Sequence, residues 1–432
     1  MKIGILKPDI KGLKQFLILW STQSLSQLGS AMTSFALTLW LYEETGSALK
    51  TAALTICSYA PYVVMSVFAG ALTDKFDKKK TMLACDLLAA LCTVAVLALY
   101  LTHRLAVWHL YAVNAFSGLM NTVQQPASEV ATTLLIPADQ YQRVSGFHSL
   151  SRSLISILNP LLATALYGLA GLKLVIAVDL GSFACAFLAL LFLIRIPEVP
   201  VTKKERLSVL VREGVTYLKN TPMILTMILF MSGINLVASA FDAVLPAYVI
   251  PNPRGGTAVL GVVTSFAGVA MVLGSLLVSV LPRPKNRMRV VFVTMLISVG
   301  IENFLLAFSR EPWIWCLSQI VGWTLVPVMS ANYDVIFRTT VPVGLQGRVY
   351  ACRNTLQFFT IPLGLFLGGW MVDSVFEPLM EVHGSSETLT ALFGAGKGAG
   401  AAVAMAVLGL AGIVHCLAWG KRMRKYRFKE EN

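Results

Sequence analysis

The amino-acid sequence predicts an all-α membrane protein whose twelve transmembrane helices form two six-helix repeats, with both termini in the cytoplasm. Three observations lead to this fold class: the abundance of apolar residues, the placement of cations between apolar segments, and an internal repeat. Of the 432 residues, 56% are hydrophobic and 13% are charged, and the mean hydropathy is +0.71. Because a soluble chain has roughly a quarter of its residues charged, we expect this one to lie in a lipid bilayer.

Apolar segments of transmembrane length recur along the whole chain. A helix that crosses a bilayer needs about 20 mainly apolar residues, and the sequence contains twelve such segments. Several are longer than a straight crossing requires, so we expect them to tilt or to extend beyond the bilayer. The predicted spans are residues 15–41, 49–73, 81–102, 106–134, 141–168, 172–194, 222–248, 257–281, 290–308, 313–337, 346–372 and 397–419.

The lysines and arginines between these spans are divided unevenly between the two membrane faces. Of the 35, 29 lie on one side and six on the other. Cytoplasmic loops carry the excess of cations, so the division indicates cytoplasmic termini and a multi-pass protein of a bacterial-type cell membrane. The formal net charge is +13, but the cations form no single patch, so we expect the lipid bilayer and no nucleic acid as a partner. We expect a monomer.

The second half of the chain repeats features of the first at an offset of 205 residues. A proline, an arginine and a valine follow the fourth span and recur in that order after the tenth, at Pro342, Arg348 and Val349. At the same offset, Glu129 corresponds to Asp334. We therefore predict a six-helix half at residues 1–196, a cytoplasmic linker with an amphipathic helix at 197–220, and a second six-helix half at 221–432.

Three predicted spans carry polar residues at helical spacing. Intervals of three and four residues place them on one helix face, and such a face is costly in lipid unless it meets protein or water. We expect these faces to line a cavity that binds a small-molecule substrate; the alternative is hydrogen bonding that only holds the helices together. The residues are Gln23, Gln27, Ser30 and Ser34; Asn114, Ser117, Asn121, Gln125 and Ser128; and Asn235 and Ser239.

Two carboxylates inside the predicted spans are candidates for coupling transport to protons. A carboxylate within a membrane is a default candidate for an ion or proton pathway. Asp242 is the first, because it shares a helix face with Asn235 and Ser239. The alternative is a solvated residue at a helix end broken by Pro246. Asp86 is the second candidate, with a structural role as the alternative.

Repeat-related charge pairs are expected at the cytoplasmic ends of the fourth and tenth spans. The sequence places Glu129 near Arg143 and Arg152, and in the second half Asp334 near Arg348 and Arg353. Our hypothesis is that one pair in each half latches the inner gate while the outer side is open. Removing one partner of a poorly solvated pair costs on the order of 3 kcal/mol.

A charged turn at residues 70–80 separates the second and third spans. Its aspartates and four lysines require water, and its lysines mark a cytoplasmic face. The turn resembles the signature loop after the second helix of the major facilitator superfamily. The resemblance implies that Asp74 accepts hydrogen bonds from the N-terminus of span 346–372; the alternative is a topology determinant made of lysines alone. The matching residues are Gly70, Leu72, Asp74, Lys75, Lys78 and Lys79.

Further motifs resemble the macrolide-efflux and secretion-effector branch of that superfamily. They are Glu43 to Ala48, Ala60 to Tyr62, Phe76 to Lys80, Asp86 with Leu87, Gln125 to Ala127, Ile176 to Asp179, and Gly347 to Val349. The resemblance implies two halves that rock about a cavity lined by the first, fourth, seventh and tenth spans. At Asn159 with Pro160 the chain departs from exporters of the superfamily, which often have glycine before the proline; from the branch it departs at Asp242 and in the extended outer loop from Glu381 to Lys397.

These observations together indicate a secondary transporter that exports amphipathic, macrolide-like molecules in exchange for protons. A siderophore or metabolite exporter, a proton-coupled nutrient importer, and a membrane scaffold or sensor without transport remain as alternatives. The sequence has no phosphate-binding loop, no nucleophile–base pattern, and seven cysteines without CxxC or Cys/His clusters. We therefore expect no enzymatic activity, no cofactor and no metal site.

Overall fold

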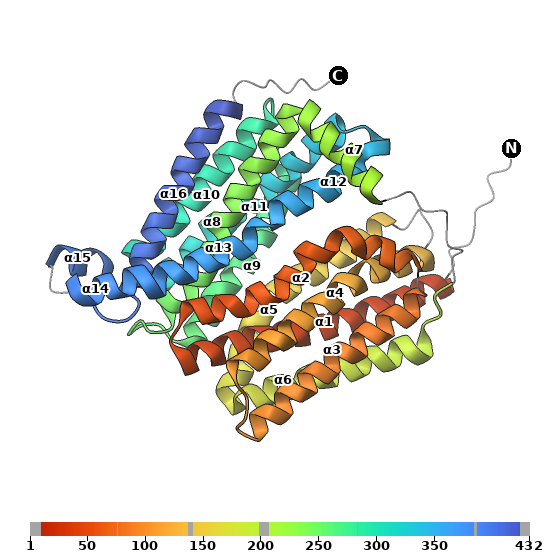
Figure 1. Ribbon diagram of the computed structural model, residues 1–432, viewed down its shortest axis with the longest axis horizontal. Coiled ribbons are helices and arrows are strands. Elements are labelled where there is room, and N and C mark those ends of the chain that lie inside the picture. The colour runs from red at the N-terminus through yellow and green to blue at the C-terminus, as the bar shows by residue number, and fades with distance from the viewer. Residues whose placement is uncertain are drawn as a thin grey trace.

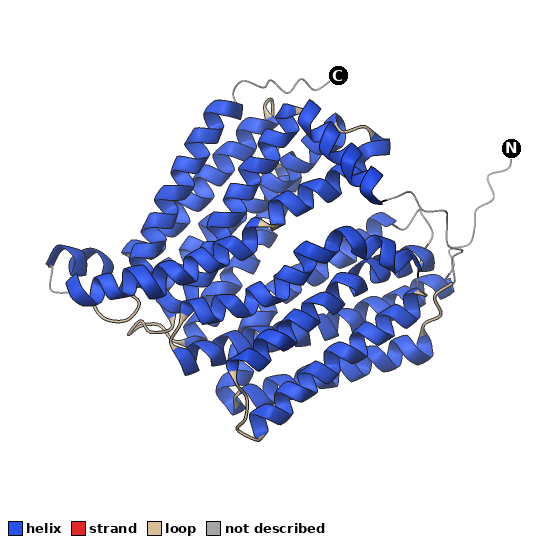
Figure 2. Ribbon diagram, in the orientation of Figure 1, coloured by secondary structure: helices blue, strands red, loops and turns tan. Residues whose placement is uncertain are grey.

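The structure, a computed structural model, describes residues 10–75, 77–136, 141–197, 207–282, 284–383 and 387–423, and these residues form helices with short connections and no strand (Figure 2). The helices are α1 (Ile10–Thr45), α2 (Ala48–Lys75), α3 (Lys78–Leu101), α4 (Val107–Leu135), α5 (Tyr141–Ala170), α6 (Leu172–Leu188) with the π-helical segment η2 (Ala189–Leu193), α7 (Leu207–Asn220), α8 (Pro222–Val249), α9 (Thr257–Val280), α10 (Arg287–Phe308), α11 (Pro312–Thr340), α12 (Val343–Phe358), α13 (Thr360–Trp370) with the π-helical segment η3 (Met371–Phe376), α14 (Glu377–His383), α15 (Glu387–Phe393) and α16 (Ala399–Met423). The prediction of an all-α protein is confirmed.

Local residue chemistry explains where several helices begin. Asp77 precedes α3, and its side chain accepts a hydrogen bond from the backbone N–H of Lys80 at 2.7 Å. Asn286 caps α10 in the same way. Proline occupies the first position of α8 and of α11, where its missing N–H costs nothing. Each of these residues marks a boundary that is visible in the sequence.

The long helices form two bundles (Figure 1). In the first bundle α1 packs against α5 and α6, and α2 packs against α4. In the second, α11 packs against α9 and α10, and α8 packs against α13 and α16. α7 packs against α12 and α8, on the side of the second bundle. The boundaries at residues 196 and 220 stay predictions.

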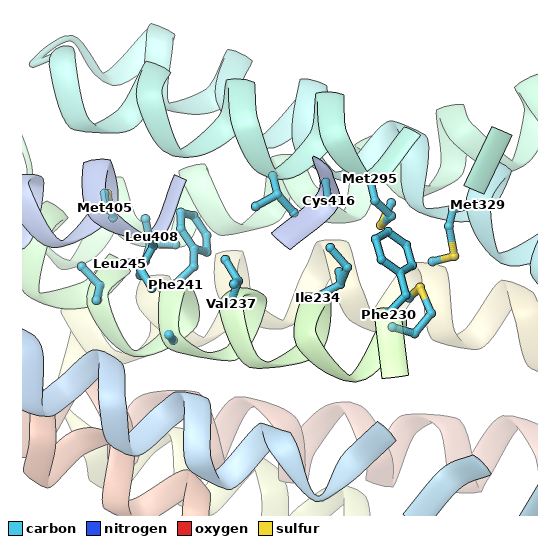
Figure 3. Packing of buried hydrophobic residues seen from close by; sticks show 14 of the residues in the cluster. Phe230, Ile234, Val237, Phe241, Leu245, Met295, Met329, Met405, Leu408 and Cys416 are labelled. Carbon is cyan, nitrogen blue, oxygen red and sulfur yellow. The ribbon is translucent and has the colours of Figure 1, made fainter. Parts of the chain in front are cut away.

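The core of the second bundle is organised around one face of α8. Phe230, Ile234, Val237, Phe241 and Leu245 recur at intervals of three and four residues and are buried. Such intervals bring side chains onto one stripe of a helix. Figure 3 shows this stripe facing Met295 of α10, Met329 of α11, and Met405, Leu408 and Cys416 of α16.

Small residues bring the two bundles into contact. A Cβ atom added at Gly261 of α9 would lie 2.8 Å from the carbonyl oxygen of Pro160 in α5, and one added at Gly369 of α13 would lie 2.6 Å from Cα of Leu49 in α2. These contacts are too close for any side chain larger than hydrogen. Glycine therefore permits the approach of α5 to α9 and of α2 to α13.

Nine helices in the described ranges are long and apolar enough to cross a membrane. Three further predicted spans, 15–41, 49–73 and 106–134, correspond to α1, α2 and α4, which have 36, 28 and 29 residues and are not among the nine. Two of these, α1 and α4, carry the polar stripes described above, and these residues lower the mean hydropathy. The number of twelve spans and the cytoplasmic location of the termini stay predictions.

Candidate functional site

A cavity of about 810 Å³, called the larger cavity below, lies within the first bundle. Its wall includes all four residues of the polar stripe predicted on α1 and the C-terminal three residues of the stripe on α4. The lining residues come from α1, α3, α4, α5 and α6, whereas the sequence predicted a cavity shared by the first, fourth, seventh and tenth spans. The predicted residues in this wall are Gln23, Gln27, Ser30, Ser34, Asp86, Asn121, Gln125, Ser128, Glu129 and Arg152.

Asp86 joins three helices in the wall of this cavity. Its carboxylate accepts a hydrogen bond from Gln23 Nε2 of α1 at 3.3 Å and another from the amide of Gln124 in α4. Gln124 lies outside the polar stripe predicted on α4. The Asp86 carboxylate is partly buried, and both of its hydrogen-bond donors are uncharged amides. These two hydrogen bonds hold α3 against α1 and α4.

Asp179 is a second carboxylate in the same wall. It is buried, and its Oδ1 accepts a hydrogen bond from Ser30 Oγ at 3.1 Å. Ser30 follows Gln23 by seven residues, which is about two helical turns, so both lie on one face of α1. Asp86 of α3 binds this face at Gln23, and Asp179 of α6 binds it two turns further on at Ser30. Part of the polar stripe on α1 therefore makes interhelical hydrogen bonds, as the alternative interpretation expected.

A smaller cavity of about 280 Å³ lies where the two bundles meet. Asn235, Ser239 and Asp242 of α8 all line it, so the three residues that share a helix face in the sequence share a cavity in the structure. Asp242 is exposed to this space. The other lining residues are Thr38 of α1; Thr51, Ala52, Thr55 and Tyr59 of α2; Ala238, Ala243 and Pro246 of α8; and Ile361 and Leu365 of α13.

Two residues of the predicted α4 stripe lie elsewhere. Asn114 donates from Nδ2 to the carbonyl oxygen of Leu110 in the same helix at 2.9 Å. Asn114 and Ser117 are not among the residues that line either cavity. The N-terminal part of the stripe therefore lies outside the cavity that its C-terminal part lines.

The signature loop is described in part. α2 ends at Lys75, and the side chains of Gly70, Leu72, Asp74 and Lys75 lie outside the described ones. Near the end of the loop, Lys79 Nζ donates to the backbone carbonyl oxygens of Leu191 at 2.9 Å and Ile194 at 2.7 Å. Lys78 begins α3. Lys79 thus satisfies carbonyl groups at the end of η2, a role that its sequence position did not reveal.

The predicted rim pairs are resolved for the second bundle. Arg353 Nη1 lies 3.5 Å from Asp334 Oδ1. The other predicted cation, Arg348, forms an ion pair with Glu213 of α7. In the first bundle, Glu129 and Arg152 line the same cavity, while the side chain of Arg143 lies outside the described ones. The sequence pattern predicted an amphipathic helix in this linker, but it did not predict Glu213 as the partner of Arg348.

The fold and the polar cavities between membrane-length helices define a helical membrane transporter. The model of the Major Facilitator Superfamily matches residues 19–365. The chain belongs to this family, so the resemblance noted in the sequence is confirmed. Family and fold are those of transporters.

Relatives and solved structures extend this result. Macrolide efflux protein A of Streptococcus pyogenes is 24% identical over 369 residues, which cover 84% of this chain and 90% of the relative. The multidrug efflux pump Tap of Mycolicibacterium fortuitum is 25% identical over 360 residues, which cover 80% and 86%. A bacterial homologue of the human lysosomal transporter Spinster, in an inward-facing and occupied conformation, has a TM-score of 0.73 at 13% identity, with 95% and 96% covered. The last comparison concerns the fold alone.

Proposed function

We propose that the protein is a secondary active transporter that exports amphipathic small molecules in exchange for protons. The observation that carries the proposal is the polar cavity of about 810 Å³ in a chain whose relatives include a macrolide efflux protein and a multidrug efflux pump. Cavities of about 300–1,000 Å³ suit drug-sized ligands. Macrolide-like molecules are the substrates we test first.

The proposed transport cycle is alternating access between two six-helix halves, residues 1–196 and 221–432, in a bacterial-type cell membrane. Twelve spans with both termini in the cytoplasm agree with the distribution of cations in the loops. The halves would rock about the place where the bundles meet, exposing the cavities to one side and then the other. The protein would act as a monomer.

Asp242 is the carboxylate we propose for proton exchange, because it faces a cavity at the meeting place of the bundles. Asp86 is the less favoured candidate, since both of its neighbours, Gln23 and Gln124, already donate to it. A carboxylate that is exposed to a cavity accepts and releases a proton without breaking interhelical hydrogen bonds.

The test is uptake of a radiolabelled macrolide into energised inverted membrane vesicles, with and without a protonophore. We expect uptake above that of empty vesicles, collapse of that uptake with the proton gradient, and loss in Asp242→Asn. Glu387→Gln, which removes an exposed carboxylate from α15, is the matched control. Uptake that does not change with the protonophore would refute proton coupling. Absence of uptake would exclude macrolides as substrates and leave the siderophore or metabolite exporter, the nutrient importer and the scaffold as the alternatives.

A further inference from the structure

The smaller cavity contains a single charged group. Asp242 is its only acidic residue, and no lysine, arginine or histidine is among the thirteen residues that line it within the described ranges. The remaining polar groups are hydroxyls of serine, threonine and tyrosine and one amide. An ionised Asp242 therefore gives this cavity a negative charge that no lining residue neutralises, and an unpaired charge among membrane-length helices is costly.

Several hydrogen-bond donors in this wall are already used. Thr38, Thr51 and Ser239 each donate to a backbone carbonyl oxygen four residues earlier in their own helix, at 3.0, 2.9 and 2.6 Å. Asn235 Nδ2 donates to a carbonyl oxygen of α12 at 3.1 Å. What these side chains still offer is the lone pairs of three hydroxyl oxygens and of Asn235 Oδ1, with the second N–H of the Asn235 amide as their one further donor. The cavity is therefore rich in hydrogen-bond acceptors.

A negative charge surrounded by acceptors selects a cation that carries N–H donors. A carboxylate or phosphate ligand would meet repulsion from Asp242 and few donors. A metal ion that has lost its water needs about six oxygen ligands arranged around it, whereas Ala52, Ala243 and Leu365 place carbon atoms on part of the wall. The carbon substituents of an organic amine fit such a wall, and its N–H groups fit the acceptors.

We propose that the transported molecule carries a protonated amine and that this cavity binds the ammonium group with Asp242 as its counter-ion. The inference rests on the proposed function, since it names the chemical class of substrate. At about 280 Å³ the cavity is near the lower limit for a whole drug-sized ligand and accommodates one functional group with its substituents.

The rest of the substrate would follow the polar face of α1 toward the larger cavity. Ser34 lines the larger cavity and Thr38 lines the smaller one. The two residues are four apart, so they lie one above the other on the same helix face. An amphipathic amine would place its cation beside Asp242 and its body along α1. Ammonium and proton then compete for one carboxylate, which gives exchange a physical basis.

Binding to the purified protein in nanodiscs tests the proposal separately from transport. The probes are 4-phenylbutylamine, 4-phenylbutanol and 4-phenylbutyrate, which share a phenyl group and an alkyl chain and carry a positive, a neutral and a negative polar end. Calorimetric titration should give a dissociation constant for the amine at least tenfold lower than for the alcohol, a difference of about 1.4 kcal/mol. We expect no binding of 4-phenylbutyrate, because its carboxylate is repelled by Asp242.

Variants assign the preference to the cavity. Asp242→Asn should remove the advantage of the amine over the alcohol, and Thr51→Val, which removes one acceptor at constant shape, should reduce it. Glu387→Gln should leave the advantage unchanged. Equal binding of amine and alcohol, a preference that survives Asp242→Asn, or no amine binding up to about 10 mM overturns the proposal. If the amine binds in a way that depends on Asp242 but no macrolide is taken up, the ammonium site stands and macrolide export is refuted. If the macrolide is taken up but the amine binds no better than the alcohol, export stands and the ammonium site is refuted.

Discussion

The carboxylate of Asp373 in η3 accepts a hydrogen bond from Ser47 Oγ at 2.5 Å. It also accepts from the backbone N–H groups of Ala48 at 3.0 Å and Leu49 at 2.9 Å, the first two residues of α2. A residue of the second bundle thus caps a helix of the first. The unpaired N–H groups and the positive end of the helix dipole both favour a carboxylate there. Gly369, one turn before Asp373, allows the close approach.

Replacing Asp373 should loosen this end of the bundle interface. Loss of a helix cap costs about 1–2 kcal/mol, so in Asp373→Ala we expect amide hydrogen exchange at residues 48–51 to be faster by about 5- to 30-fold. Asp373→Asn should have a smaller effect, because it keeps an acceptor and loses only the charge. Hydrogen exchange with mass spectrometry measures this.

Glu381→Gln serves as the control for this prediction, since Glu381 is an exposed carboxylate two turns further along the chain. Unchanged exchange at residues 48–51 in Asp373→Ala would show that the cap does not hold the bundles together. A change of equal size in both variants would point to net charge as the cause.

The docking of α7 should depend more on close packing than on its ion pair. Glu213 and Arg348 keep 44% and 27% of their side chains exposed, and such pairs contribute about 1 kcal/mol or less. A Cβ at Gly214, by contrast, would lie 2.8 Å from the carbonyl oxygen of Arg348 and from Cys352 Sγ. Gly214→Leu should therefore detach α7, whereas Glu213→Gln should leave it docked.

Limited proteolysis within residues 207–220 is the measurement for α7. We expect rapid cleavage in Gly214→Leu and cleavage near the wild-type rate in Glu213→Gln. The reverse order would show that the ion pair holds the helix. Tyr217→Phe, which loses the hydrogen bond to the carbonyl oxygen of Thr340, should fall between the two.

The sequence predicts the helices well because each boundary and face is a local property. The span predicted at 222–248 corresponds to α8 at Pro222–Val249, since proline sets its start and the apolar interval sets its buried face. The partner of a side chain on another helix is not a local property. Periodicity places Ser30 on a polar face, but nothing in the sequence says that Asp179 lies opposite, 149 residues away.

For the same reason, the sequence predicts the polar faces of the cavities but not which helices enclose each cavity. The sequence identified polar faces on α1, α4 and α8, and these faces contribute to the walls of the larger and the smaller cavity. It did not predict that α8 would face a separate, smaller space with α2 and α13. The arrangement depends on which helices approach each other, and that is decided by small residues such as Gly369 whose neighbours are distant in the chain.

Asp334→Asn should change stability little. The carboxylate is 51% exposed and its distance to Arg353 Nη1 is 3.5 Å, so we expect a loss of about 1 kcal/mol or less instead of the roughly 3 kcal/mol of a buried pair. Both residues belong to the second bundle, so a role as a latch between halves would require a different conformation. Thermal unfolding in nanodiscs, with Arg353→Gln as the reciprocal variant, tests this, and a large loss in either one would contradict it.

Gly322 should be intolerant of alanine because of one neighbour. A Cβ at this position in α11 would overlap the carboxylate of Glu302 in α10, which is buried and accepts a hydrogen bond from Gln319 Nε2 at 3.2 Å. Overpacking of this kind costs about 1–3 kcal/mol. Gly322→Ala should therefore lower the thermal unfolding temperature clearly. Gly300→Ala is the matched control, because its nearest neighbour, Ile413 Cγ1, would lie at 3.2 Å and belongs to a flexible side chain.

A second substitution shows whether Glu302 is the cause. In a Glu302→Ala background the carboxylate is gone, so adding Gly322→Ala should lower the unfolding temperature by much less than it does in the wild-type protein. The difference between the two backgrounds measures the coupling of the two positions. Equal losses in both backgrounds would show that the cost of the added methyl group comes from the helix backbone or another neighbour, and that Gly322 is not kept small by the Glu302 carboxylate.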